Sequence, residues 1–235
     1  MNLAKSFRLA AVYVVTIGFF AGCAYCASIV TTTIAEIIPL KRLHVIVIDA
    51  GHGGIDGGAT SCSGVLESGL NLEIALRLDD LFHLLGYQTV MIRRTDISVY
   101  TTGETIASQK MSDLRQRVRI VEESENPGLI SIHQNTFQDT RYHGAQVFYA
   151  SGEESREFAR LLQAQLIATV NPGSHRAIKK ADGVYLMQHV TCPAVLLECG
   201  FLSNPKEESK LRTREYQQQL CCVIAATTGG FLSNT

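Results

Sequence analysis

The sequence lacks an excess of charge of either sign. Its 235 residues include 21 lysines and arginines and 22 aspartates and glutamates, for a formal net charge of -1. Proteins that bind nucleic acid or a strongly anionic membrane surface usually present a basic face, which this composition does not indicate. We therefore expect no nucleic-acid partner, and other partners must be inferred from the chemistry of a site.

The cysteines also lack the spacings that mark a disulfide framework or a cysteine zinc site. The seven cysteines are Cys23, Cys26, Cys62, Cys192, Cys199, Cys221 and Cys222. The first two lie within an apolar N-terminal run, and the other five form an odd set without a Cys-x-x-Cys pair. We expect most of them to be small apolar packing residues.

Common nucleotide-binding and nucleophile motifs are missing as well. Residues 45–60, VIVIDAGHGGIDGGAT, run from an apolar strand into a glycine-rich loop of the kind that often cradles a phosphate. A dinucleotide loop starting at Gly51 would need a third glycine where the chain has Asp56. A Walker loop would need a lysine, and none occurs between Arg42 and Lys110. Gly-x-Ser-x-Gly, which is typical of a serine nucleophile, is also absent.

The sequence does contain an apolar N-terminal segment. Residues 9–30 carry no charge over 22 positions, and Lys5 and Arg8 precede them. A helix of this length can cross a hydrocarbon core of roughly 30 Å. The positive flank predicts an N-terminus in the cytoplasm, with the rest of the chain exported. We interpret residues 1–30 as an uncleaved membrane anchor, with a cleaved signal peptide or a lipoprotein acylated at Cys23 as the alternatives.

Residues 31–42 are interpreted as a linker, and residues 43–235 as one domain in which apolar strands alternate with longer helices. The expected strands cover 43–49, 88–93, 128–133, 145–150 and 194–199. The expected helices cover 67–86, 112–126 with Ser112 as N-cap, 155–170, and a single helix from Pro205 to 229. Several strands are too uniformly apolar to have a wet face. The pattern predicts an α/β domain with a largely parallel sheet and helices on both faces.

Residues with metal or acid-base chemistry occur at the carboxyl ends of these strands or open the next helix. They are His52 after the first strand, Glu67 at the first helix, His133 in strand 128–133 and Glu198 in strand 194–199. Open α/β sheets bind ligands at that edge. Two histidines and a carboxylate form a catalytic zinc set that leaves the fourth position for water, and a further glutamate can take the proton of that water. The two histidines and Glu67 are the predicted ligands, and Glu198 is the predicted general base of a zinc hydrolase.

Each of these residues also has an ordinary structural explanation. His52 can belong to a turn, His133 can be a core histidine, and Glu67 can serve the helix dipole. Glu198 is harder to explain, because a glutamate is rarely enclosed in an inner strand without a partner. The four together favour a site.

Four segments follow one another in the order IDAGHGGIDGGA, VLESGLNLEIALRL, SIHQN and PAVLLECGFLSN. In this order they resemble the zinc-dependent N-acetylmuramoyl-L-alanine amidases of the third amidase family, over residues 43 to about 228. The resemblance implies a central mixed sheet flanked by helices. It also implies hydrolysis of the amide between the lactyl group of N-acetylmuramic acid and the L-alanine of the peptidoglycan stem peptide. The family's zinc ligands fall on His52, Glu67 and His133, and its catalytic glutamate falls on Glu198.

The segments DLRQRV and GVYLMQHVTCPAVLLECGFLSNP look most like the membrane-anchored, spore-cortex type, which has no separate wall-binding domain. This implies peptidoglycan as substrate and a catalytic domain on the outer side of the cytoplasmic membrane. Because a short anchored enzyme has no wall-binding domain of its own, a protein activator is a candidate partner, although the sequence does not say whether one is needed. Two alternatives stay open. One is a non-catalytic wall-binding or regulatory module of the same fold, and the other is a zinc peptidase or deacetylase that cleaves a different bond of the wall.

Further residues are predicted to contact substrate or to support the site. Arg176 and Lys179 are expected to meet an acidic stem peptide, and Asn135 to hold substrate or cap the following turn. Asp49 and Asp56 are candidates for orienting the histidines, with turn formation as the equal alternative. Arg93 is expected to be structural. Cys199 should point away from the metal because adjacent strand residues face opposite ways. The loop glycines should permit positive φ and leave space beside the backbone for a metal and a bulky glycan-peptide substrate.

Overall fold

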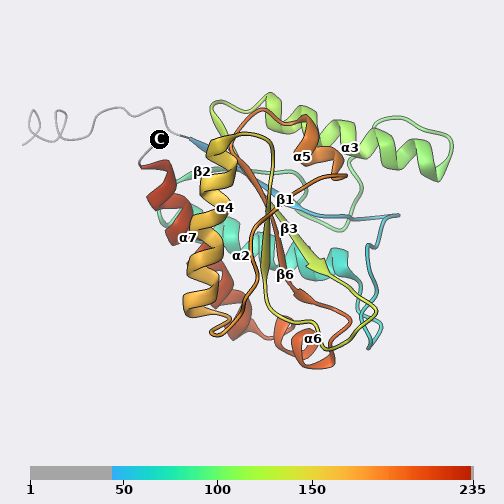
Figure 1. Cartoon of the computed structure of the whole chain (residues 1–235). Helices are drawn as coiled ribbons and strands as arrows, with labels where there is room; N and C mark the ends of the chain where they lie inside the picture. The colour runs from blue at the N-terminus through green and yellow to red at the C-terminus, as the bar shows by residue number, and fades with distance from the viewer. Residues whose placement is uncertain (1–43, 234–235) are drawn as a thin grey trace, which may run out of the picture. The chain divides into compact units, whose positions relative to one another are not determined.

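A six-stranded mixed sheet forms the middle layer of the domain in this computed structural model, which describes residues 44–233 (Figure 1). The strand order is β2-β1-β3-β6-β4-β5. The strands are β1 (Val45–Ala50), β2 (Gln88–Met91), β3 (Pro127–Asn135), β4 (Gln146–Tyr149), β5 (Lys179–Lys180) and β6 (Ala194–Phe201). β2, β1, β3 and β6 are parallel, whereas β4 runs antiparallel to β6 and pairs in parallel with β5. The prediction of a largely parallel sheet in an α/β domain is confirmed.

The predicted anchor and linker, residues 1–42, lie outside the described residues. Among residues 44–233, no helix is both long enough and apolar enough to span a bilayer. The interpretation of residues 9–30 as a membrane segment therefore stays a prediction.

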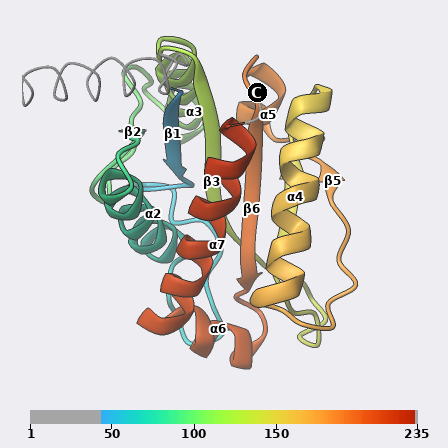
Figure 2. The same cartoon turned by 90° about the vertical axis from the view of Figure 1, so that its left-hand side faces the viewer.

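Helices cover both faces of the sheet. On one face α2 (Glu67–Leu84), α7 (Arg214–Leu232) and α4 (Glu153–Thr169) lie side by side (Figure 2). The other face carries α3 (Ile106–Glu122) and the short α5 (Tyr185–His189), and α6 (Pro205–Leu211) precedes α7.

The inner strands are mostly apolar because helices cover both of their faces. In β1, the buried side chains of Ile46 and Ile48 belong to the larger core, which also contains residues of α2, α4 and α7. Val47 points the opposite way into a smaller core with residues of α3 and α5. Period-2 alternation along the strand thus divides its side chains between two cores.

The predicted N-cap at Ser112 is wrong. α3 begins earlier, where Thr105 is the N-cap and accepts a hydrogen bond from the backbone N–H of Ser108. The Ser112 hydroxyl instead accepts hydrogen bonds from the backbone N–H groups of Thr101 and Thr102. A serine inside the helix therefore ties down the preceding loop, which its sequence context does not reveal.

The prediction of one helix from Pro205 to 229 is also wrong, because the segment forms α6 and α7. The chain leaves the helical conformation at Thr213, whose φ of -83° and ψ of 140° are extended. The Thr213 side chain then accepts a hydrogen bond from the backbone N–H of Tyr216 and begins α7. The two-residue β5 and the five-residue α5 were not predicted, because elements this short carry no periodicity.

The carboxyl ends of β1, β3 and β6 meet at one edge of the sheet, and β4 begins there because it runs the other way. In the strand register, His133 pairs with Glu198, and Glu198 pairs with Gln146. Leu196, two residues before Glu198, belongs to the core on the α3 face, so Glu198 also projects from that face. Three polar residues therefore form a row across adjacent strands at this edge.

Candidate metal centre

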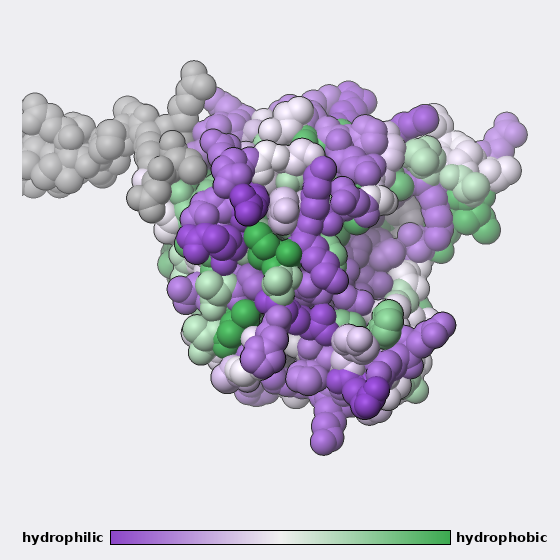
Figure 3. Space-filling view, viewed as in Figure 1, coloured by the Kyte–Doolittle hydropathy of each residue, from purple (hydrophilic) through white to green (hydrophobic). Residues whose placement is uncertain are grey.

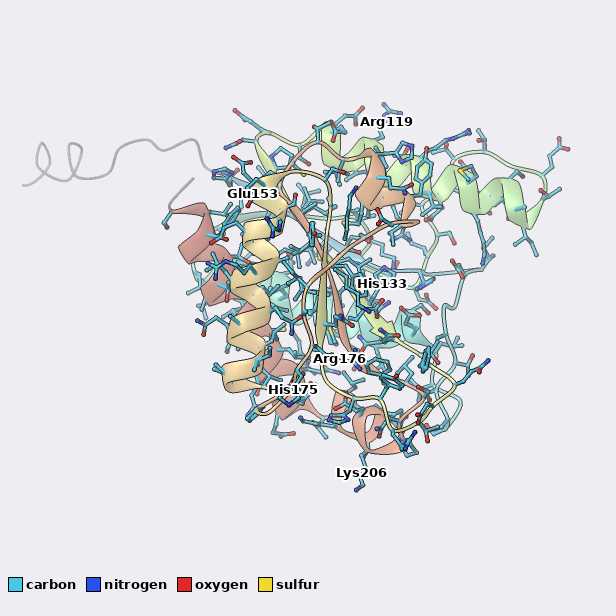
Figure 4. All side chains as sticks on the ribbon, in the orientation of Figure 1. Arg119, His133, Glu153, His175, Arg176 and Lys206 are labelled. Atoms are coloured by element: carbon cyan, nitrogen blue, oxygen red, sulfur yellow. The ribbon has the colours of Figure 1, made fainter. Side chains whose placement is uncertain are left out.

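Three of the predicted residues form a cluster at the carboxyl edge of the sheet. His52 lies in the loop after β1, and Glu67 is the first residue of α2. His133, labelled in Figure 4, lies near the end of β3. The Nε2 atom of His52 is 3.3 Å from Oε2 of Glu67, and Nδ1 of His133 is 3.0 Å from Oε1. Among residues 44–233, these three side chains form a group that could hold a metal ion, because their possible ligand atoms all lie within 4.8 Å of one another.

The donor set fits a zinc ion. Ligands at about 2.1 Å in a tetrahedral site lie roughly 3.4 Å apart, which is close to the spacing of these nitrogen and oxygen atoms. The two imidazole rings meet edge to face, with centroids 5.0 Å apart. The side chains of His52 and His133 are 26% and 19% exposed, so the cluster is open on one side, as a catalytic site with a free coordination position requires.

Glu67 is held in place by several donors. Its carboxylate accepts hydrogen bonds from the backbone N–H groups of Ala59 and Gln134, at 2.9 and 3.1 Å. Burial alone would raise the pKa of Glu67, but hydrogen bonds and charges of His133 and His52 outweigh burial and hold it far below its usual value. The carboxylate is therefore ionised, which metal binding needs.

Asn71 is a supporting residue that the sequence analysis missed. It is fully buried, and its Nδ2 atom donates to the carbonyl of Gly51 and to Oε1 of Glu67. Its Oδ1 atom accepts from Nε2 of Gln134. Asn71 thus joins the β1 loop, α2 and β3. The sequence feature that could have identified Asn71 is its position four residues after Glu67, on the same face of the helix.

His52 is oriented by Asp56, as predicted. Its Nδ1 atom is 3.1 Å from Oδ2 of Asp56, and Lys110 binds the other oxygen of that carboxylate at 3.0 Å. Burial alone would lower the pKa of His52, but Glu67 and Asp56 outweigh burial and raise it to about 9. His52 also has a φ of 61°, which is uncommon for a residue with a side chain.

Two buried arginines hold the backbone that carries His52. Arg93 donates to the carbonyls of Ala50 and Gly51, which confirms its expected structural role. Arg117, which the sequence analysis did not single out, donates to the carbonyl of His52 at 2.7 Å and to Asp49 at 2.5 Å. Asp49 therefore acts through Arg117 rather than by touching a histidine.

Glu198 lies beside this cluster, on the strand next to His133. Its Oε2 atom is shielded from solvent and has no hydrogen-bond partner among residues 44–233. Burial raises the pKa of Glu198 to about 7. Cys199 faces the opposite core and is fully buried, as predicted.

The three predicted substrate residues lie apart from the donor cluster. Asn135 ends β3, and its carbonyl accepts a hydrogen bond from the backbone N–H of Leu202. Lys179 begins β5 at the far side of the sheet. Arg176 precedes β5, and its Nη1 atom donates to Oε1 of Gln146, the register partner of Glu198.

Comparison with known proteins assigns the chain to a family. A family model described as N-acetylmuramoyl-L-alanine amidase matches residues 46–227. The germination-specific N-acetylmuramoyl-L-alanine amidase of Bacillus subtilis (strain 168) is 37% identical over 189 residues, which are 80% of this chain and 78% of that protein.

Two solved structures of amidases support the same family assignment. The CwlD amidase from Clostridioides difficile, solved in complex with the GerS lipoprotein, has a TM-score of 0.78 at 34% identity, covering 82% of this chain and 100% of that chain. An N-acetylmuramoyl-L-alanine amidase from Clostridium difficile 630 has a TM-score of 0.72 at 28% identity, covering 83% of this chain and 99% of that chain. The chain therefore belongs to the N-acetylmuramoyl-L-alanine amidase family and is a hydrolase of the amide bond between N-acetylmuramic acid and L-alanine in peptidoglycan.

Proposed function

We propose that this amidase is zinc-dependent, with His52, Glu67 and His133 as the zinc ligands and Glu198 as the general base. The observation that carries the proposal is the Oε2 atom of Glu198, which is enclosed without a partner beside three converging donors. An unpartnered buried carboxylate oxygen is costly. The Oε2 atom would gain a hydrogen-bond partner if it faced the water molecule that attacks the substrate.

The chemistry follows from the positions of these groups. When bound, zinc supplies a positive charge that acidifies a water and polarises the amide carbonyl. Glu198 takes a proton from the attacking water and delivers it to the L-alanine nitrogen as the C–N bond breaks. The products are the lactyl carboxylate and the free amine of the stem peptide. Burial raises the pKa of Glu198, and the positive charge of a bound zinc would lower it again, which favours the ionised form that accepts the proton.

The biological setting is part of the same proposal. The 37% identity to a germination-specific amidase supports a role in the spore cortex, and a cell-wall substrate places the domain outside the cytoplasm. Residues 9–30 would anchor it to the cytoplasmic membrane. A relative crystallised with a lipoprotein supports a protein partner here as well.

The test is a digest of purified peptidoglycan by the purified protein, analysed by mass spectrometry with and without a chelator. We expect muramic acid without peptide, together with stem peptides that carry a free L-alanine amine, and loss of both with chelator. Glu198→Gln should retain zinc, measured by metal analysis, and lose about 10²- to 10⁴-fold in kcat. Cleavage within the stem peptide, or deacetylated sugar, would identify a peptidase or a deacetylase instead.

A further inference from the structure

A second cavity lies next to the row of His133, Glu198 and Gln146. It has a volume of about 710 Å³ and is lined by the segment after β3 and the segment before β5. Gln146 forms part of its wall and is also the register partner of Glu198. The cavity therefore begins one strand away from the proposed general base. Figure 3 shows mostly hydrophilic side chains, with smaller apolar patches between them, on the face of the molecule seen in Figure 1.

Two hydrogen bonds hold the Arg176 side chain in this cavity, and its Nη2 donors stay unused among the described residues. Its Nε atom donates to the carbonyl of His143 at 2.7 Å, and Nη1 donates to Oε1 of Gln146 at 2.9 Å. The guanidinium carbon lies 4.4 Å from the ring centroid of Phe201 and 5.8 Å from that of Tyr142. No residue within 44–233 accepts a hydrogen bond from Nη2 or forms a salt bridge with Arg176. The guanidinium is thus oriented before any ligand arrives, which reduces the entropy lost on binding.

The charges around this cavity favour an anion. Lys179 adds a second cation to the lining, and the acid in the lining, Asp139, is already paired with Arg141 at 2.7 Å. Gln146 cannot neutralise Arg176, because its amide is uncharged and its Nε2 atom donates to the carbonyl of Ala177. The carboxylate whose charge acts on Arg176 is Glu207, which accepts a hydrogen bond from the Gly144 N–H.

The cavity on the other side of the metal cluster has the opposite character. It has a volume of about 330 Å³, and Asp49, Asp56 and Asp113 line it. Its cations are already paired: Lys110 binds Asp56, and Arg117 binds both other aspartates. An incoming carboxylate would meet like charges there. Of the two cavities that flank the site, the one with Arg176 is therefore suited to the acidic part of a substrate.

The distance from Arg176 to the reacting amide matches the length of the first two residues of a stem peptide. Adjacent strands are about 4.8 Å apart, so Arg176, bonded to Gln146 on the strand beside Glu198, lies on the order of 10 Å from the reacting amide. In the stem peptide, D-glutamate follows L-alanine and continues the chain through its γ-carboxyl, which leaves its α-carboxylate free. An extended chain covers about 7 Å over two residues, so this carboxylate reaches roughly the same distance from the scissile bond.

We propose that Arg176 binds the free α-carboxylate of the D-glutamate in the stem peptide and thereby selects non-amidated peptide. This subsite rests on the proposed amidase function. The guanidinium offers Nη2 as a charge-assisted donor to a carboxylate, whereas the α-amide found in some cell walls is uncharged and accepts through only one of its two polar atoms. Arg176 acts on specificity and not on the bond-breaking step.

The experiment compares two soluble glycan strands whose stem peptides carry either D-glutamate or its α-amide. We expect the zinc-loaded wild-type protein to have a kcat/KM about tenfold or more higher for the carboxylate form, the size of one charge-assisted hydrogen bond near solvent. In Arg176→Gln this ratio should fall toward one through a loss on the carboxylate form. Arg176→Lys should give an intermediate ratio, because it keeps the charge without the planar fork.

Arg119→Gln is the matched control, because Arg119 is an exposed arginine on α3, away from the site (Figure 4). Its ratio should equal that of the wild type. Equal rates of wild-type protein on both substrates, or an Arg176→Gln variant that loses the same factor on both, would overturn the subsite and leave the amidase proposal standing. A zinc-loaded wild-type protein that cleaves neither strand would instead count against the proposed zinc-dependent function.

Discussion

At the scale of single residues, the loop after β1 shows why so many glycines surround His52. Gly53, Gly54 and Gly58 have φ values of 129°, 59° and 68°, a region that favours glycine. A Cβ atom at Gly58 would lie 2.6 Å from Oε2 of Glu67, and one at Gly51 would collide with the ring of His133. The expectation that these glycines permit positive φ is confirmed, and the space beside Gly51 and Gly58 is occupied by the side chains of His133 and Glu67.

Gly51→Ala should displace His133 and weaken metal binding. The added methyl group has no room, and overpacking of this kind costs about 1–3 kcal/mol. We expect a reduced zinc content and lower hydrolysis at unchanged helical content by circular dichroism. Gly69→Ala is the control, because a Cβ at this exposed position of α2 meets nothing within 4 Å. It should keep full zinc and gain about 0.5–1 kcal/mol in stability. Full zinc binding by Gly51→Ala would contradict the steric explanation.

At the scale of elements, α3 is joined to the site by one buried side chain. Arg117 forms ion pairs with Asp49 in β1 and Asp113 in its own helix, and it donates to the carbonyl of His52. Asp49 also accepts a hydrogen bond from the Ser131 hydroxyl of β3. A single network therefore fixes the distance between α3, two strands and the loop that carries His52.

Arg117→Met should lower the free energy of unfolding by about 3–5 kcal/mol, because it leaves Asp49 buried without its counter-charge. The measurement is urea denaturation at pH 7. Asp49→Asn together with Arg117→Met removes both charges and should recover part of the loss. A double variant that is no more stable than Arg117→Met would show that packing of the arginine, and not the charge, matters.

The same pair predicts a pH dependence of stability. Burial alone would raise the pKa of Asp49, but the charge of Arg117 and hydrogen bonds from Ser131 and Arg117 outweigh burial and lower it. A carboxyl group with a lowered pKa in the folded state stabilises the fold above its unfolded pKa of about 3.9. This contribution is lost as the pH falls through the folded pKa. Urea midpoints measured from pH 7 down to pH 3 should fall more steeply for the wild type than for Asp49→Asn.

At the scale of the whole molecule, the proposed metal centre joins three parts of the domain. His52 follows β1, Glu67 begins α2 and His133 belongs to β3, so an ion held by all three would link the loop, a helix and the middle of the sheet. Such a ligand stabilises the folded state because the unfolded chain does not bring the three together.

Removal of zinc should therefore lower the melting temperature. At free zinc 100-fold above the dissociation constant, binding adds about 2.7 kcal/mol. For a domain of this size that corresponds to roughly 5–10 °C. Differential scanning calorimetry with and without chelator measures the shift. His52→Ala should show little response to chelator, and a wild-type melting temperature that does not change would contradict zinc binding by these residues.

The boundaries of elements were less predictable than their order. The inner strands were found within two residues of their ends because apolar runs have a clear pattern. Ser112 and the break at Thr213 were missed because both depend on which backbone N–H groups a hydroxyl meets. Hydroxyl side chains serve equally well as caps, as loop ties or inside a helix, so their sequence context does not decide among these roles.

The sequence by itself determined the α/β class and singled out His52, Glu67, His133 and Glu198, because strand periodicity and ordered motifs are local properties of the chain. Only the tertiary structure decided what surrounds them: Asn71 and Arg117 behind the donor cluster, and Gln146 and Arg176 beside Glu198. These contacts join residues that are far apart in the chain, through hydrogen bonds with no preferred spacing. Their partners are set by how strands and helices pack, and that is a property of the folded molecule.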